Sequence, residues 1–525
     1  MLTLIKLINT LNQQIDRMKV NRGIQTAIRF QAVFAIVALS FSSLNSIEVA
    51  TAKSLNKQGI RQTLQQLANS KSTKPGQNRR IAQNPPDSPP APTTTGARGK
   101  LPNNLEVPKT GSEVRITNTQ TLTLQDAINT AFRNNREVQS ARLTIERSSA
   151  AVSTAQAPQA LQIGATANVT NQGNPLLVGN SNPNALNNST EIGGGLQATY
   201  PIYTAGRDSA TIRAAEEQVN FDRLDLLRVE QKLRGDVITA YYDLQEADSS
   251  VIINQATVKD AARSLSDAQL QEKAGVGTKF DILRAQVQLA NANQALTTAG
   301  GQQQTARKKI AQILSVSEVT EFTTADPVAE SGTWRYSLED SIILAFKNRP
   351  ELKQQLVRRA ISQQQQIVAA AGDSPQASLF ANYNIGKNLN STLSAQDNYS
   401  LGARLSWTFW DGGAARSRSY QERVNQEITE NQFTTARNQV RFEVEQSYNA
   451  LNTNRKNIAT SIQALQQAEE SLKLARLRFQ AGVGTQTDVI QAQTELARAR
   501  GNKVTAILNY NRSLSNLRTA TVLSP

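Results

Sequence analysis

The sequence predicts an α+β membrane protein in which two copies of one unit join β-hairpins to very long coiled-coil helices. Three observations support this prediction. The chain repeats its own motifs at offsets of 207 to 214 residues, two stretches of 68 residues lack proline, and four segments alternate between apolar and polar residues. A fixed offset indicates a duplicated unit, and apolar periods of seven and two residues indicate coiled-coil helices and strands.

The composition excludes several classes of protein. The chain has no cysteine and no histidine, which excludes disulfides, cysteine or histidine metal sites and histidine-dependent nucleophiles. We expect no cofactor. The net charge of +15 comes mostly from residues 1–118, which hold 16 of the 57 basic but only five of the 42 acidic residues. The remaining chain is nearly neutral, so nucleic acid is not expected as a partner.

The first 118 residues are predicted to comprise an export signal followed by a linker. Basic residues precede the apolar run FQAVFAIVALSF and an Ala-Thr-Ala site, which predicts a signal peptide over residues 1–52. A short anchoring helix is the alternative, although this run is shorter than the ~20 residues that a spanning helix needs. Residues 53–118 contain NPPDSPPAP and few large apolar side chains, which predicts a disordered linker.

The duplication sets the domain boundaries. Residues 124–134 recur at 338–348, the junction at 200–206 recurs at 407–413, and AGVGT at 274–278 is repeated identically at 481–485. The first repeat is predicted at 119–314, with a helix, a hairpin at 161–203 and helices at 207–274 and 280–314. A joining segment at 315–336 precedes the second repeat at 337–525, with a helix, a hairpin at 377–410 and helices at 414–481 and 487–521.

The long helices follow from an uninterrupted heptad pattern. Apolar residues recur at steps of 4, 3, 7, 7 and 7 from Val237 in the first copy and from Val444 in the second. Sixty-eight residues of helix would extend about 100 Å at ~1.5 Å per residue. A heptad repeat makes helices pack as coiled coils. This pattern alone fits a cytosolic coiled coil equally well.

The four alternating segments favour a membrane protein. In the strand at 399–409, for example, Tyr399, Leu401, Ala403, Leu405 and Trp407 alternate with small or polar residues. Alternation over ~10 residues with aromatic residues toward the ends is typical of a transmembrane strand whose other face lines water. A half-buried sheet of a soluble domain is the alternative for any one strand. Four matching strands that flank such helices behind a signal peptide favour the membrane.

Four strands are too few for a membrane barrel. The smallest membrane barrels have about eight strands, and an open sheet edge in lipid leaves backbone groups unpaired. The protein must therefore share one barrel among several copies. This argument permits two, three or four.

The motifs quoted above resemble those of the TolC-type outer-membrane efflux family over residues 121–521. The resemblance implies a homotrimer with a 12-stranded β-barrel in outer-membrane lipid, four strands from each protomer, that continues into an α-helical coiled-coil tunnel in the periplasm. It also implies a periplasmic adaptor and an inner-membrane RND, ABC or MFS transporter as partners. The protein would then be a passive, non-enzymatic channel for efflux or type I secretion.

The resemblance also assigns roles to the two turns. The residues expected to dock the adaptor are Ala274, Gly275, Val276, Gly277, Thr278, Ala481, Gly482, Val483, Gly484 and Thr485. Glycines there also make the tight reversal itself. The residues expected at the periplasmic gate are Asp281, Arg284, Asp488 and Gln491, with Asp488 at the constriction-ring position. Helix capping is a compatible alternative for both aspartates.

Two departures from the family pattern concern the gate. Tyrosine and arginine side chains close the tip in family members, whereas Phe479 and Gly484 stand at the matching positions here. We therefore expect the pore to be held shut either more weakly or by other contacts, such as those of Arg284. In the predicted barrel, Arg404 faces the lumen by alternation.

Two other functions remain as alternatives. A structural coiled-coil or surface-fibre protein would share the helices but would not conduct ions. A carboxylate-based hydrolase would need a pocket-forming domain that the sequence lacks. The cargo and the class of transporter do not follow from the sequence.

Overall fold

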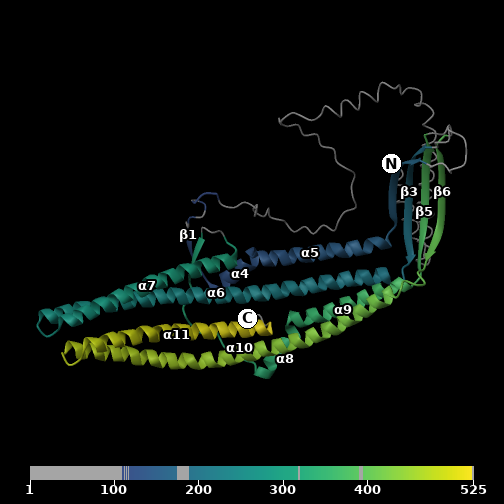
Figure 1. Cartoon of the computed structure of the whole chain (residues 1–525). Helices are drawn as coiled ribbons and strands as arrows, with labels where there is room; N and C mark the ends of the chain where they lie inside the picture. The colour runs from purple at the N-terminus through teal and green to yellow at the C-terminus, as the bar shows by residue number, and fades with distance from the viewer. Residues whose placement is uncertain are drawn as a thin grey trace, which may run out of the picture. The chain divides into compact units, whose positions relative to one another are not determined.

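The computed structural model describes residues 109–522, except 112, 114, 116–117, 174–187, 317–319 and 390–393. The signal peptide predicted at 1–52 and nearly all of the linker predicted at 53–118 lie outside the described residues. Within the described part, two copies of one series of elements follow each other, with one short strand pair added (Figure 1). No helix in this part is both long enough and apolar enough to cross a lipid bilayer.

The two copies have matching elements. The first comprises α4 (Leu124–Asn134), α5 (Arg136–Gln156), β2 (Gln162–Gly173), β3 (Asn188–Tyr203), α6 (Arg207–Lys273) and α7 (Lys279–Leu314). The second comprises α8 (Leu338–Asn348), α9 (Pro350–Ala370), β5 (Gln376–Asn388), β6 (Gln396–Ser406), α10 (Ala414–Gln480) and α11 (Gln486–Thr521). Each of the four helices that follow the hairpins has one end that differs by a single residue from the expected bounds.

The one helix expected before each hairpin is in fact two helices. In the first copy, Asn135 separates the two helices. Its side chain accepts hydrogen bonds from the backbone N–H groups of Glu137 and Val138, which caps α5. In the second copy, Pro350 occupies the first position of α9, where its missing N–H costs nothing. The break therefore has a local cause in each copy.

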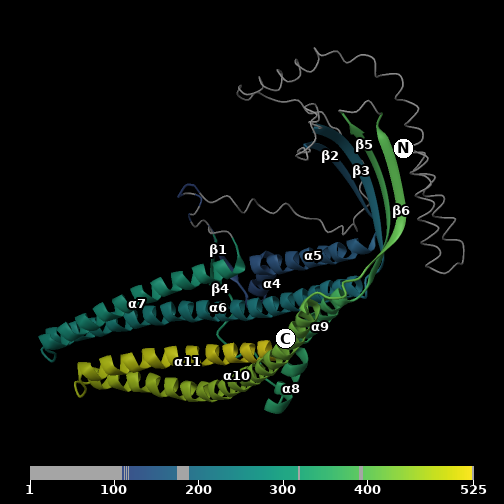
Figure 2. The same cartoon turned by 45° about the vertical axis from the view of Figure 1, so that its right-hand side comes forward.

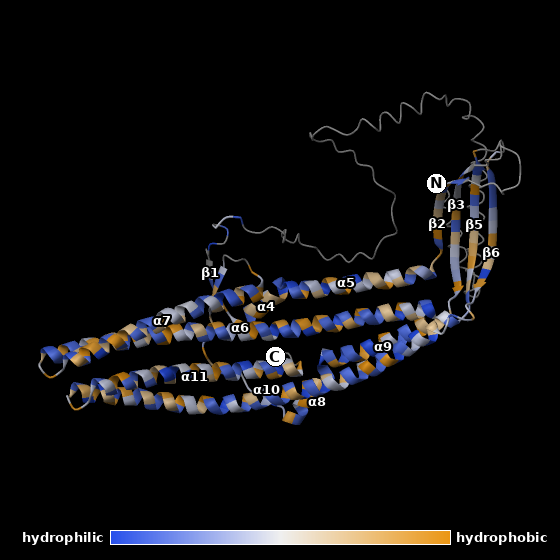
Figure 3. Cartoon of the chain, in the orientation of Figure 1, coloured by the Kyte–Doolittle hydropathy of each residue, from blue (hydrophilic) through white to orange (hydrophobic). Residues whose placement is uncertain are grey.

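The heptad positions of α6 and α10 are mostly buried. Val237, Tyr241 and Leu244 are fully buried in α6, as is Val444 in α10, while Leu451 is 5% exposed. Figure 3 shows hydrophobic and hydrophilic residues interspersed along both helices, as expected for a narrow apolar seam. Packing along this seam stabilises helices of 67 residues.

The helices form one layer in which α6 packs against α5, α7, α9 and α11, and α10 packs against α9 and α11 (Figures 1 and 2). The contacts of α6 with α9 and α11 join the two copies. Consequently α5 and α7 lie along one edge of the layer, and α10 lies along the other.

The four strands form one antiparallel sheet in the order β2-β3-β5-β6. The register places the alternating residues on two chemically distinct faces. The apolar face includes Ile163, Ala165, Val169, Ile192, Leu196, Leu379, Tyr383, Ile385, Leu401 and Leu405. The polar face includes Gln162, Thr166, Asn168, Gln197, Ser378, Asn382, Asn384, Ser400 and Arg404. Most of these apolar side chains are exposed, with Val169 and Leu405 each at 71%, whereas Leu196, Leu379 and Tyr383 are half-buried.

The last strand is shorter than expected. The alternation predicts a strand through Phe409, but β6 ends at Ser406, which pairs with Gln376, the first residue of β5. Beyond this point the partner strand no longer offers backbone groups. Trp407 instead donates a hydrogen bond to the carbonyl oxygen of Asp373 at 3.0 Å, and its ring packs against that of Phe409 with an interplanar angle of 40°.

A parallel strand pair, β1 (Asn118–Leu122) with β4 (Thr320–Thr324), lies beside α6 and α7. Asn118, the last residue of the predicted linker, therefore begins a strand. Next to this pair, the hydroxyl of Tyr241 donates to Asp326 Oδ2 at 2.6 Å, and the backbone N–H of Leu124 donates to the same oxygen at 2.8 Å. Burial, and then this hydrogen bond, raise the pKa of Tyr241. The carboxylate of Asp326 thus fixes the start of α4 to α6.

Candidate functional site

The two glycine turns have the same backbone geometry. Gly275 has φ 78° and Gly482 has φ 72°, values in the left-handed region that favours glycine. A Cβ atom at Gly277 would lie 2.9 Å from the backbone nitrogen of Glu272, and one at Gly484 would lie 2.9 Å from a side-chain atom of the preceding turn. Each turn therefore needs glycine at both positions, one for the bend and one for close packing.

A capping box follows each turn. Thr278 accepts from the backbone N–H of Asp281 at 3.2 Å, and the Asp281 carboxylate accepts from the backbone N–H of Thr278 at 3.2 Å. Thr485 and Asp488 repeat this exchange at 3.2 and 3.0 Å. Hydrogen bonds from Thr485, first from its backbone and then from its side chain, lower the pKa of Asp488. The capping role weighed for both aspartates is thus observed, and Asp488 is held in its charged form.

The tips of the two turns are exposed and apolar. Val276 is 76% exposed and Val483 is 71% exposed, each at the centre of its turn. Bare backbone and small side chains surround them, so that another helix could approach closely. Exposed apolar side chains at matching ends of two hairpins are a feature of interaction surfaces.

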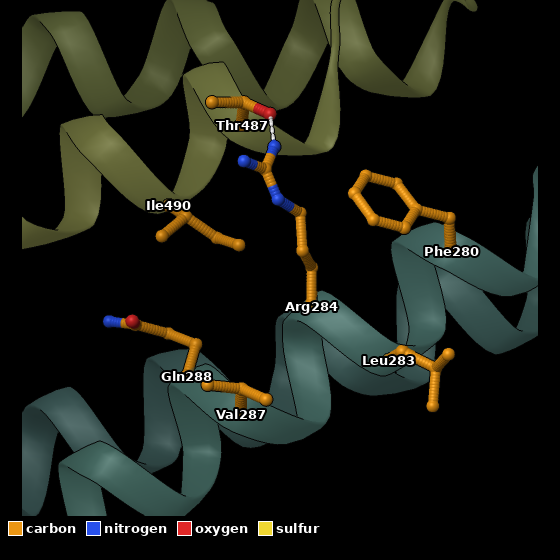
Figure 4. Close-up of a pocket in the computed structure, with 7 residues that line it drawn as sticks. All are labelled: Phe280, Leu283, Arg284, Val287, Gln288, Thr487 and Ile490. Atoms are coloured by element: carbon orange, nitrogen blue, oxygen red, sulfur yellow. Dashed lines mark hydrogen bonds between the residues drawn. The ribbon is translucent and has the colours of Figure 1, made fainter.

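Arg284 connects the two hairpins next to the turns. Figure 4 shows it extending from α7 to α11, where its Nη1 donates to the hydroxyl of Thr487. Its guanidinium group also lies 5.2 Å from the centre of the Phe280 ring, one helical turn earlier on α7. The ring holds the long side chain toward α11. The structure therefore places this predicted gate residue in a direct contact between the two copies.

An open groove of about 380 Å³ surrounds this contact. Its lining comprises Phe280, Leu283, Arg284, Val287, Gln288, Thr487 and Ile490 (Figure 4). The apolar residues of α7 are exposed, with Phe280 at 63% and Val287 at 60%. At an offset of 207, the second copy has threonine at both positions, Thr487 and Thr494. The two tips thus differ in surface chemistry, a difference that the sequence could have shown by direct comparison of the repeats.

The remaining gate residue makes a local contact only. Gln491 donates to Glu495 at 3.2 Å along the exposed side of α11. The nearby seam between the copies is polar: Arg476 forms an ion pair with Asp260 at 2.8 Å, and Gln271 donates to the carbonyl oxygen of Phe479 at 2.9 Å. These contacts connect α6 to α10 behind the turns. Gln491 itself has no hydrogen bond to the first repeat within the described part of the chain.

The sheet contains a second candidate feature, on its polar face. Arg404 lies over the ring of Phe380, with 5.1 Å between the guanidinium carbon and the ring centre. The ring in turn covers Gly402, where a Cβ would lie 2.9 Å from it. Sequence alternation placed Arg404 on this face but missed the aromatic residue beneath it. In the described residues, no group of three or more acidic side chains is arranged to hold a metal ion.

A sheet with one exposed apolar face, joined to helical hairpins of about 100 Å, defines a class of membrane-associated channel proteins. The model of the outer membrane efflux protein family matches residues 127–316 and 342–521. The chain belongs to this family, and both matched segments correspond to the two repeats. The family places the protein in the outer membrane.

The individual relatives match only part of this chain, at low to moderate sequence identity. The chain is 27% identical to protein CyaE of Bordetella pertussis over 308 residues, which cover 58% of this chain and 65% of CyaE. It is 35% identical to the outer membrane efflux protein BepC of Brucella suis over 112 residues, or 21% of this chain and 24% of BepC. The chain thus spans less than two thirds of either relative. The crystal structure of the Campylobacter jejuni CmeC outer membrane channel has a TM-score of 0.66 at 13% identity, covering 80% of this chain and 93% of CmeC. This likeness concerns the fold.

Proposed function

We propose that the protein is a passive exit duct of the outer membrane, through which an inner-membrane transporter delivers its substrates to the exterior. The observation that supports the proposal is the sheet, whose apolar face is exposed and whose outer strands, β2 and β6, each have one edge without a partner strand among the described residues. Such a ribbon is stable in lipid only when its edges are paired. The helices that continue from it are long enough to extend far into the periplasm.

Three copies give the duct its walls. A four-stranded ribbon from each protomer makes twelve strands, with the face that carries Arg404 toward the lumen. The β2 strand of one protomer then pairs with the β6 strand of the next, and these two strands run antiparallel, as all neighbours in this sheet do. The same symmetry brings the α7 edge of one protomer against the α10 edge of the next.

The two turns are the proposed docking site for a periplasmic adaptor. Val276 and Val483 present apolar side chains on turns that are otherwise bare backbone, which suits the tip of another helical hairpin. The adaptor connects the duct to a transporter of the RND, ABC or MFS class, and the system serves efflux or type I secretion. Adaptor binding is tested with Val276→Asp and Val483→Asp, which should abolish it, against Val276→Ala and Val483→Ala, which should retain it.

The tip contacts form the proposed gate. The hydrogen bond from Arg284 to Thr487 holds the two hairpins of a protomer together in the closed state. Three copies of Asp281 and Asp488 surround the entrance with negative charge, which attracts cations. Opening requires the two hairpins of a protomer to separate. A partner protein that binds the turns can therefore drive the opening.

Planar-bilayer conductance of the purified protein tests the duct directly. We expect discrete, trimer-dependent channels that prefer cations, and we expect Asp281→Asn with Asp488→Asn to reduce that preference. A structural coiled-coil or fibre protein would give no channels. A soluble, non-conducting product would reject the proposal.

A further inference from the structure

A pocket between the two repeats, far from the turns, contains two arginine side chains without partners. Arg234 of α6 and Arg518 of α11 line a cavity of about 190 Å³ beneath the start of α4. Neither guanidinium group has a hydrogen bond or ion pair to any residue in the described part of the chain. Both side chains are half-buried. Two like charges that share a partly dry pocket repel each other.

The second repeat shows what a paired arginine looks like at the equivalent position. Arg441, 207 residues after Arg234, forms an ion pair with Glu445 at 2.8 Å, one helical turn later. In the first repeat that later position is Ile238, which is buried in the pocket wall. The duplicated position has therefore kept its arginine without its carboxylate, and it faces a second arginine instead.

Other hydrogen-bond donors complete the pocket. Tyr242, Gln231 and Ser515 line it together with the two arginines. Burial raises the pKa of Tyr242, so its hydroxyl is a neutral donor at physiological pH. Burial, and then the charge of Arg518, lower the pKa of Arg234, although an arginine remains charged at this pH. Every group named here can therefore donate to a negative ligand.

We propose that this pocket binds a small oxyanion, a phosphate or carboxylate group, between Arg234 and Arg518. Guanidinium groups bind such planar or tetrahedral oxyanions through two parallel hydrogen bonds, which a chloride ion cannot accept in the same way. The volume of about 190 Å³ exceeds several times the ~30 Å³ share of a water molecule, so the ligand fits with some of its hydration.

The site stays accessible in the proposed trimer. Its walls come from α4, α6, α11 and Ser331 of one protomer, whereas α7 and α10 lie along the edges of the helical layer. The bound anion would connect the two repeats beside the strand pair β1 and β4. The proposal does not depend on channel activity.

Isothermal titration of the purified full-length oligomer with inorganic phosphate and, separately, with acetate tests the proposal at constant ionic strength set by chloride. We expect phosphate to bind more tightly than acetate because it carries more charge. Arg234→Gln and Arg518→Gln should each weaken phosphate binding at least about tenfold. Arg441→Gln, the matched control in the other repeat, should leave the affinity within about twofold.

Thermal unfolding without added oxyanion separates binding from a merely structural role. Removing one of two repelling charges should leave the unfolding temperature of Arg234→Gln at or above that of the wild type, and phosphate should no longer raise it. If Arg518→Gln fails to assemble, Arg234→Gln alone decides. The proposal is overturned if phosphate and acetate give no binding heat with the wild type, or if phosphate binds Arg234→Gln and Arg441→Gln equally.

Discussion

Replacing Arg284 by alanine should open the proposed gate. The side chain makes two contacts, one with the Phe280 ring of its own helix and one with the Thr487 hydroxyl of α11. Only the second must break when the hairpins separate. The first contact directs the arginine toward its acceptor, so that little side-chain entropy remains to be lost on closure.

The magnitude follows from that single hydrogen bond. An exposed bond of this kind contributes about 1 kcal/mol net, below the ~1.5–3 kcal/mol typical of charged groups, because water competes for the guanidinium group. Three protomers that open together lose about 3 kcal/mol, which is about a hundredfold in the ratio of closed to open channels at ~1.4 kcal/mol per factor of ten. We therefore expect Arg284→Ala to raise the open probability about a hundredfold.

Single-channel recording in planar bilayers measures this ratio. Thr487→Val, which removes the acceptor and keeps the side-chain shape, should have a similar effect, and the double variant should be no more open than either single variant. Arg263→Ala removes an equal charge from the exposed surface of α6 and should leave gating unchanged. If Arg284→Ala opens the channel but Thr487→Val does not, the effect comes from the charge of Arg284. The hydrogen bond to Thr487 is then refuted as the contact that holds the gate closed.

Three further outcomes follow from the described contacts. Tyr241→Phe removes a donor from the half-buried carboxylate of Asp326 and should lower the free energy of unfolding by about 1–3 kcal/mol, whereas Tyr448→Phe, its counterpart in the second repeat, should change it little in chemical denaturation. Gly277→Ala should destabilise the turn because a Cβ would lie 2.9 Å from backbone, while Gly300→Ala has open space and should stabilise α7 in thermal unfolding. The pKa of Asp488 is lowered from 3.8, so its capping contribution is complete above pH 3.8 and is lost as the pH falls through the lowered pKa. The difference in unfolding temperature between wild type and Asp488→Asn should therefore vanish at acidic pH; a difference that persists there would contradict the capping argument.

The helices and strands were predictable because their periods are long and uninterrupted. Sixty-eight residues without proline and a heptad stripe leave few alternatives to a long helix, and the register of the sheet places the alternating residues on opposite faces as the pattern indicated. The end of β6 was not predictable in this way. Trp407 and Phe409 continue the alternation in sequence, but the partner strand begins at Gln376, and only the pairing shows this.

Sequence periodicity does not predict the contacts between the repeats. Arg284 and Thr487 are 203 residues apart. The apolar pattern of either helix alone does not show which of its exposed residues contact the other repeat. The same holds for Arg234 and Arg518. The capping boxes, in contrast, depend on residues three positions apart, so that both could be anticipated from the two turns alone.

Cross-linking between protomers tests the central claim, that strands of separate copies pair edge to edge. The chain has no cysteine, so Ala167→Cys on β2 can be combined with one cysteine at Tyr399, Leu401 or Ala403 on β6 without competing thiols. Within one sheet these strands lie about 14 Å apart at ~4.8 Å per strand, beyond the ~7 Å limit for a disulfide. Any bond must therefore join two copies.

We expect oxidation of at least one of these pairs in the membrane to give covalent dimers and trimers and nothing larger on a denaturing gel. The single-cysteine variants should give no trimers. Only monomers from every pair, or a ladder that continues beyond three chains, would contradict a closed barrel shared by three protomers.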